Sequence, residues 1–166
     1  MRHYDGGMNH EPKLVRHPAF QAMGLATRTT NALEMNSATA RIPTIWQRFF
    51  AENVGAAIPH RTHPQNLLGV YTNYVSDHTG EYSMIVAAEV DERTDQTGLT
   101  YLTVPVTNYL VFSASGAMPQ TVVETWQRVW AYFTPGAAHQ RAYTVDFERY
   151  DAARPDFIEI YIAIKE

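Results

Sequence analysis

Two segments of the chain have the spacing of an amphipathic helix. Between Thr39 and Asn53, apolar side chains recur at steps of three and four residues, at Ile42, Ile45, Trp46, Phe49 and Phe50. The segment PQTVVETWQRVWAYF, residues 119–133, has the same character. Because an α-helix turns once in 3.6 residues, these steps collect the apolar side chains on one face. Both segments are therefore predicted to be helices.

The other apolar segments have the alternation or the short apolar runs of β-strands. Alternation is strictest near the end of the chain, where isoleucine occupies positions 158, 160, 162 and 164. We predict strands around residues 20–25, in LLGVYTNYVSD and YSMIVAAEVD on either side of a polar HTGE turn, in TYLTVPVTNYLVFSAS, in AYTVDFERYD and in FIEIYIAIK. Helices mixed with strands in this way predict the α+β class.

The order strand, helix, strand, strand occurs twice, with the polar loop ERTDQTG between the copies. Each predicted helix carries the tripeptide Trp-Gln-Arg at the same place. Such a repeat predicts one domain over residues 13–166, made of a first module at 13–92 and a second at 98–166. Residues 1–12 are polar and lack a period, which predicts a flexible N-terminal segment.

Strand alternation also predicts which side chains share a face. The isoleucines of the last strand are expected to pack on a helix, which leaves Tyr161 on the other face. In the strand before it, Phe147 is expected on the helix-packed face and Glu148 on the opposite one, with Tyr150 and Tyr74. Tyr71 has the other parity, so it joins them only if a bulge after Gly69 shifts the register.

The two copies can also be aligned residue by residue. Setting YTNY (71–74) against FERY (147–150) puts the neutral Thr72 opposite Glu148. The predicted scaffold therefore has aromatic side chains on both sides and one carboxylate on one side.

Composition excludes several classes of function. The 166 residues include no Cys, so disulfides, thiolate metal sites and cysteine nucleophiles are excluded. There are 13 Lys and Arg against 17 Asp and Glu, with no basic cluster, which argues against nucleic-acid binding. The sequence has no long apolar run and no secretion signal, so we expect a soluble, cytoplasmic protein. The chain has ten Tyr, seven Phe and three Trp, many in predicted strands, where aromatic side chains can be core residues but can also form binding walls.

The ordered pattern resembles the GyrI-like small-molecule-binding domain, also called the AraC-type effector-binding domain, which includes stand-alone integron-associated proteins. The resemblance runs from about Lys13 to Glu166. Its residues are the first strand running into Gly24, Ile45-Trp46, Gly69-Val70-Tyr71, Glu81-Tyr82, Thr125-Trp126 to Trp130, and Asp146-Phe147-Glu148-Arg149-Tyr150-Asp151.

This resemblance implies two β-α-β-β modules of the SHS2 type, related by a pseudo-twofold axis. They would form an antiparallel sheet with a central ligand groove and with helices on the outer side. It implies a small organic ligand, cationic and aromatic like many drugs, with Glu148 as its counter-ion. The ligand walls are expected from Tyr71, Tyr74, Tyr82, Tyr109, Tyr150, Tyr161 and Trp126.

The chain departs from the regulators of this family because its N-terminal segment is too short for a helix-turn-helix. We therefore expect a stand-alone binder, monomeric or dimeric, or a protein that acts through a separate regulator. No cofactor or metal is expected, and His60 and His63 are interpreted as residues of a solvated loop.

Other interpretations stay open at this stage. Glu148 could be an exposed strand residue paired with Arg149, and Trp46 and Trp126 could be ordinary core residues. The same groove could instead belong to a hydrolase of reactive electrophiles, in which Glu148 would be the catalytic residue. A third possibility is an interaction module for a transcription or DNA-topology partner.

Overall fold

The computed structural model describes residues 11–166, whose frame is a single antiparallel sheet of eight strands. The order across the sheet is β1-β6-β8-β7-β3-β4-β2-β5. The strands are β1 (Lys13–His17), β2 (Phe20–Thr29), β3 (Asn66–Thr72), β4 (Tyr82–Val90), β5 (Thr100–Val104), β6 (Thr107–Ser115), β7 (Asp146–Asp151) and β8 (Phe157–Ala163). The α+β prediction is confirmed. Most of the segment predicted to be flexible, residues 1–10 of 1–12, lies outside the described residues.

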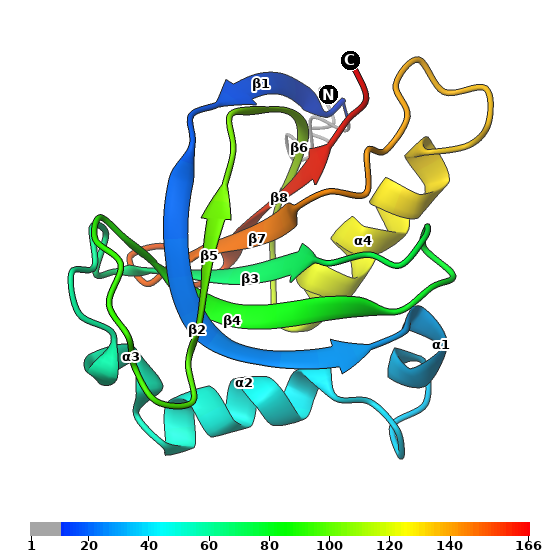
Figure 1. Cartoon of the computed structure of the whole chain (residues 1–166). Helices are drawn as coiled ribbons and strands as arrows, with labels where there is room; N and C mark the ends of the chain where they lie inside the picture. Colours follow the sequence, from blue (N-terminus) through cyan, green and yellow to red (C-terminus); the bar gives the residue numbers. More distant parts are fainter. Residues whose placement is uncertain (1–10) are drawn as a thin grey trace, which may run out of the picture.

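Two long helices lie on one face of this sheet, and both agree with the predicted segments within a few residues. They are α2 (Ile42–Ala51) and α4 (Gln120–Tyr132), and the short helices are α1 (Asn31–Glu34) and α3 (Val54–Ala57). In α2, Ile45 and Phe49 are buried against the sheet, and in α4 Thr125 and Val129 occupy the corresponding positions. Helix α2 packs on β2 and β4, and α4 packs on β6 and β8; Figure 1 shows α2 below β2 and β4, and α4 toward the right behind the strands.

The sheet curls strongly, so both of its faces are buried. One face carries the side chains under α2 and α4, and we call it the helix-covered face. The helix-free face closes on itself around a second core that includes Val70, Tyr109, Phe147 and Tyr161. The long, bent strand β2 runs along this curl (Figure 1), and at Gly24 it approaches β4 so closely that a Cβ atom would lie 1.8 Å from the carbonyl oxygen of Val86.

Proline divides the predicted strand TYLTVPVTNYLVFSAS into two. Pro105 and Val106 form the turn between β5 and β6, as Pro18 and Ala19 do between β1 and β2. The two strands that flank each turn do not pair with each other. Instead, β1 pairs with β6 of the second half, and β5 pairs with β2 of the first. Each half of the chain therefore completes the sheet of the other.

The strand registers show which residues of the two halves are equivalent. Gly69 pairs with Val86 across β3 and β4, as Glu148 pairs with Ile160 across β7 and β8. One register further, Tyr71 pairs with Met84 as Tyr150 pairs with Ile158. The same relation connects two isolated bridges, Arg61 to Val90 and Arg141 to Ile164.

The alignment of Thr72 with Glu148 was therefore wrong. Glycine at position 69 is the counterpart of Glu148, and Tyr71 is the counterpart of Tyr150. Gly69 and Glu148 are also direct partners across the central ladder, so the pseudo-twofold axis passes between them. Aligning YTNY with FERY matched similar letters but moved every side chain of one strand to the wrong face.

The predicted faces were right for β8 and wrong for β7. Ile158, Ile160 and Ile162 pack under α4, as expected. Phe147, however, lies in the core of the helix-free face, stacked on Tyr161 with ring centroids 4.4 Å apart, so Glu148 and Tyr150 point toward the helices. Since both faces of the curled sheet are apolar, an apolar residue such as Phe147 does not identify the helix-covered face.

Candidate functional site

A buried carboxylate lies at the centre of the helix-covered face. Glu148 is 2% exposed and accepts three hydrogen bonds from neutral donors. Its Oε1 atom accepts from the hydroxyl of Tyr150 at 2.9 Å. Its Oε2 atom accepts from the hydroxyl of Tyr71 at 2.9 Å and from the indole Nε1 of Trp126 at 2.7 Å. Strands β3 and β7 and helix α4 thus all contribute to one site.

Gly69 provides the space for this carboxylate. It lies directly across the β3–β7 ladder from Glu148, on the same face of the sheet. A Cβ atom at Gly69 would lie 2.5 Å from Oε1 of Glu148 and 3.2 Å from the methyl group of Met84. Glycine is needed here to let another group approach the backbone closely, because even a methyl group would overlap the carboxylate.

The electrostatic setting of Glu148 is unusual for a buried acid, because no base neutralises it. None of the ion pairs within residues 11–166 includes Glu148. Burial raises the pKa of Glu148, and the hydrogen bonds from Trp126, Tyr71 and Tyr150 oppose that rise. Burial, followed by the nearby Glu148 charge, raises the pKa of Tyr71 and of Tyr150 well above the ordinary value, which keeps both hydroxyls protonated as donors.

Aromatic rings surround the acid in two matched pairs. Trp46 of α2 meets the ring of Tyr150 edge-on at 5.3 Å, and Trp126 of α4 meets the ring of Tyr71 edge-on at 5.1 Å. Trp46 and Trp126 are half-buried. Each carries a further ring one helical turn on: Phe50 stacks on Trp46 at 6.1 Å, and Trp130 lies 6.2 Å from Trp126.

These outer rings reach the surface. Phe50 is 64% exposed and Trp130 is 47% exposed. From the surface inward, the rings follow in order of burial: the exposed Phe50 and Trp130, the half-buried tryptophans, and the tyrosines that bond Glu148.

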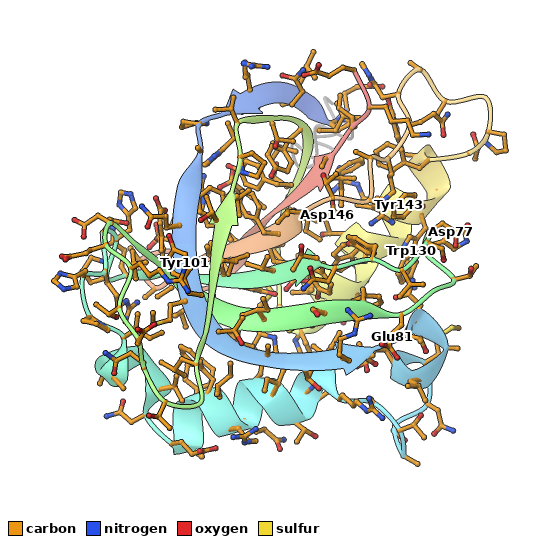
Figure 2. The ribbon with its side chains drawn as sticks, viewed as in Figure 1. Asp77, Glu81, Tyr101, Trp130, Tyr143 and Asp146 are labelled. Carbon is orange, nitrogen blue, oxygen red and sulfur yellow. The ribbon has the colours of Figure 1, made fainter. Side chains whose placement is uncertain are left out.

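A second buried acid lies two residues away on the same face. Asp146 is 0% exposed, and its Oδ2 atom accepts from Arg141 at 2.8 Å and from the Tyr74 hydroxyl at 2.6 Å. Its Oδ1 atom accepts from the backbone N–H of Ala163 at 2.7 Å. Arg141 in turn lies over the ring of Tyr143, with its guanidinium carbon 4.4 Å from the centroid. In Figure 2, Tyr143 and Trp130 lie toward the same end of the molecule as Asp146, and Tyr101 lies toward the other.

The structure brings some of the predicted site residues together around Glu148. Tyr71, Tyr150 and Trp126 contact it directly. Tyr82 lies one ring further, 5.8 Å from Tyr71, and Tyr74 lies 5.8 Å from Tyr82. Tyr71 and Tyr74 reach the same face without a bulge after Gly69, because Asn73 between them has a left-handed φ of 52° that resets the alternation.

Two predicted site residues lie elsewhere. Tyr161 and Tyr109 belong to the core of the helix-free face, with ring centroids 5.8 Å apart, and the sheet separates them from Glu148. Pairing of Glu148 with Arg149 was also wrong, since Arg149 bonds Glu159 at 2.6 Å on that other face. Sequence reasoning did not assign Gly69, Phe50, Trp130 or the Arg141–Asp146 pair to the site. An available signal was the aromatic residue four positions after each repeated tryptophan.

Residues 11–166 contain no group of three His, Asp or Glu side chains arranged to hold a metal ion. His60 approaches Glu92 at 3.4 Å, and His63 approaches Glu89 at 4.0 Å. In the same range, no helix has the length and hydropathy needed to cross a bilayer.

Solved structures of other proteins resemble this chain in fold. An integron cassette protein from Vibrio cholerae has a similar crystal structure, with a TM-score of 0.78 and 34% identity over 93% of this chain and 96% of that one. SAV2435, solved bound to tetraphenylphosphonium, has a TM-score of 0.74 and 23% identity over 93% of this chain and 94% of that one.

Sequence comparisons agree with the structural ones. YobU of Bacillus subtilis, named as a suspected transcriptional regulator protein, is 33% identical over 150 residues, which are 86% of this chain and 91% of YobU. Residues 13–164 match the family described as integron-associated effector binding protein. The chain therefore belongs to the integron-associated effector-binding protein family.

Proposed function

We propose that the protein binds a small aromatic cation, with Glu148 as its counter-ion and the surrounding rings as its walls. The observation that carries this proposal is a carboxylate that is 2% exposed, bonded by neutral donors only and surrounded by aromatic side chains. A buried acid without a basic partner is costly, and a ligand cation would offset that cost.

The surrounding groups suit a cation better than an anion or a neutral polar molecule. Tyr71, Tyr150 and Trp126 orient the carboxylate but bring no positive charge. Each aromatic face near a cation adds about 0.5 to 2 kcal/mol. Three or four such contacts, with the attraction of the carboxylate, are consistent with a dissociation constant of about 1 μM.

The ligand must displace side chains to reach Glu148, because the carboxylate is covered. Trp126 and Tyr150, which bond the carboxylate, and Trp46, which packs on Tyr150, are only half-buried. We expect these rings to change rotamer on binding, so that a ligand ring replaces the contact that Trp46 makes with Tyr150 or Trp126 makes with Tyr71.

Relatives support this ligand chemistry. SAV2435, which shares the fold, was solved with tetraphenylphosphonium, a cation that carries four aromatic rings. The family is described by effector binding, and YobU bears a regulator's name.

Calorimetric titration tests the proposal with tetraphenylphosphonium and with uncharged triphenylphosphine oxide. We expect micromolar binding of the cation, much weaker binding of the neutral compound, and a loss of at least about tenfold in cation affinity in Glu148→Gln. Glu159→Gln is the matched control, since Glu159 lies on the neighbouring strand and the opposite face. Equal affinities for the two compounds, or for Glu148→Gln and the wild type, would refute the counter-ion role. Mass spectrometry of the recovered ligand tests the hydrolase alternative, which requires a product.

A further inference from the structure

The aromatic walls around Glu148 repeat about the pseudo-twofold axis. This axis passes between Gly69 and Glu148, which are partners in the central ladder and equivalent in the two modules. Tyr71 and Tyr150 are equivalent by the same registers, and both hydroxyls bond the same carboxylate. One acid thus lies between two equivalent tyrosines.

The helices continue this symmetry outward. Trp46 and Trp126 stand at the same place in the two Trp-Gln-Arg repeats, and each crosses to the tyrosine of the other module, at 5.3 Å and 5.1 Å. Phe50 and Trp130 follow each tryptophan by four residues, at 6.1 Å and 6.2 Å, and both are exposed. We call Trp46 with Phe50 the α2 wall, and Trp126 with Trp130 the α4 wall.

The charge, unlike the walls, is not repeated. Gly69 occupies the position equivalent to Glu148, and a Cβ atom there would already lie 2.5 Å from Oε1 of Glu148. A second acid therefore cannot share the axis. The other acid on this face, Asp146, is taken by Arg141 at 2.8 Å. The site has two walls and one available negative charge.

From this asymmetry between walls and charge, and resting on the proposed function, we infer the ligand class: monocations with two aromatic arms on a central charge, one arm on each wall. Such a molecule puts its charge near the axis, within reach of Glu148, while each arm stacks against one helix. A cation with the same ring area in a single arm fills one wall and leaves the other without a partner. Stacking on each wall favours the two-armed shape by about fivefold.

Two isomeric probes separate shape from size and charge. Dibenzyldimethylammonium and (biphenyl-4-ylmethyl)trimethylammonium have the same formula and charge, but the first has two arms and the second has one. Calorimetric titration should give an affinity at least about fivefold higher for the two-armed isomer. Equal affinities, or tighter binding of the one-armed isomer, would overturn the inference.

Substitution of the outer rings tests whether both walls are used. Phe50→Ala and Trp130→Ala change exposed side chains, so thermal unfolding should stay close to that of the wild type, and Met35→Ala, 88% exposed on another helix end, is the control. Each wall variant should weaken the two-armed cation by about threefold, and the double variant by about tenfold. Loss confined to one wall would contradict the two-armed arrangement.

Glu148→Gln distinguishes failure of this inference from failure of the proposed function. If Glu148→Gln weakens both isomers but the isomers bind equally, the counter-ion role stands and the two-armed class is wrong. If neither isomer binds the wild type, or if Glu148→Gln leaves both affinities unchanged, the proposed function fails and the inference fails with it.

Discussion

Two acids on β7, Asp146 and Glu148, lie two residues apart on the same face and are both buried, yet their surroundings are opposite. Asp146 has a guanidinium partner, a tyrosine hydroxyl and a backbone N–H. Glu148 has two tyrosine hydroxyls and an indole N–H, all neutral. The strand therefore carries one charge that the fold neutralises internally and one that it does not.

The difference separates a structural group from a candidate binding group. Asp146 and Arg141 are 0% and 6% exposed, and each would be an isolated buried charge without the other. Burial lowers the pKa of Arg141, but Asp146 and Tyr74 raise it by more, so the guanidinium stays charged. Glu148 is solvated by neutral dipoles, which hold a carboxylate without satisfying its charge. A ligand cation could pair with Glu148 without displacing a basic side chain, whereas at Asp146 it would compete with Arg141.

Breaking the Arg141–Asp146 pair should have the largest effect on stability. Asp146→Asn leaves Arg141 buried without its carboxylate, and we expect it to lower the free energy of unfolding by about 3 to 5 kcal/mol. Urea denaturation measures this change, with Glu148→Gln as the control on the same strand face. A loss below about 1 kcal/mol would mean that the two acids are not different in the way the structure indicates.

Substituting Gly69 should affect the Glu148 side of the comparison alone. Gly69→Ala puts a methyl group 2.5 Å from Oε1 of Glu148, so we expect a cost of about 1 to 3 kcal/mol in stability and weaker cation binding. Urea denaturation and calorimetric titration measure the two effects. The stability cost should shrink in Gly69→Ala/Glu148→Ala, where the carboxylate is gone. An unchanged cost in that double variant would show that Met84, not Glu148, sets the limit.

The two tryptophans should differ although their positions are equivalent. Trp126→Phe removes the indole N–H that donates to Oε2 of Glu148, and we expect it to cost about 1 kcal/mol in cation binding beyond Trp46→Phe. Trp46 meets Tyr150 through its ring, which phenylalanine partly replaces. Titration of both variants with one cation tests this. Equal losses would mean that the indole N–H contributes nothing at Glu148.

The smallest expected effect is on the pH dependence of stability, in which Glu148→Gln should differ from the wild type. Burial raises the pKa of Glu148, so the folded protein favours the protonated acid and loses stability as the pH rises from the ordinary carboxyl pKa through the raised one. Glu148→Gln cannot titrate. Its stability relative to the wild type should therefore increase with pH and converge with the wild type in acid. Unfolding curves across the acidic range measure this, and a relative stability that decreases with pH would contradict it.

Sequence patterns predicted the elements better than the faces. Three- and four-residue steps located α2 and α4, because a helix on a sheet must bury one side, as Ile45 and Phe49 show. The face of β7 was misassigned because Phe147 packs into a second core that exists only once the sheet has curled. The alternation of apolar residues within one strand cannot show which of two apolar faces is covered by helices.

The candidate site was partly predictable for similar reasons. Glu148 was found through the family pattern, and Trp126 stood among the candidates, but an apolar helix position does not reveal that its indole donates to an acid. The side chains of Tyr71 and Tyr74 reach the same face because Asn73 between them has a left-handed backbone conformation, which strand alternation alone does not predict. Arg141 and Asp146 are close in sequence, yet Asp146 also bonds Tyr74, which follows β3, and Ala163 at the end of β8.

Because edge strands are exchanged, each half of the chain depends on the other to complete its part of the sheet. Because β1 pairs with β6 and β5 pairs with β2, a fragment of either half would keep one strand of each edge ladder and lose the strand that pairs with it. Neither half can leave without opening ladders at both margins of the sheet as well as at its middle. Melting should therefore be a single cooperative event, and a nick in the 92–98 loop should yield two pieces that hold together until both unfold.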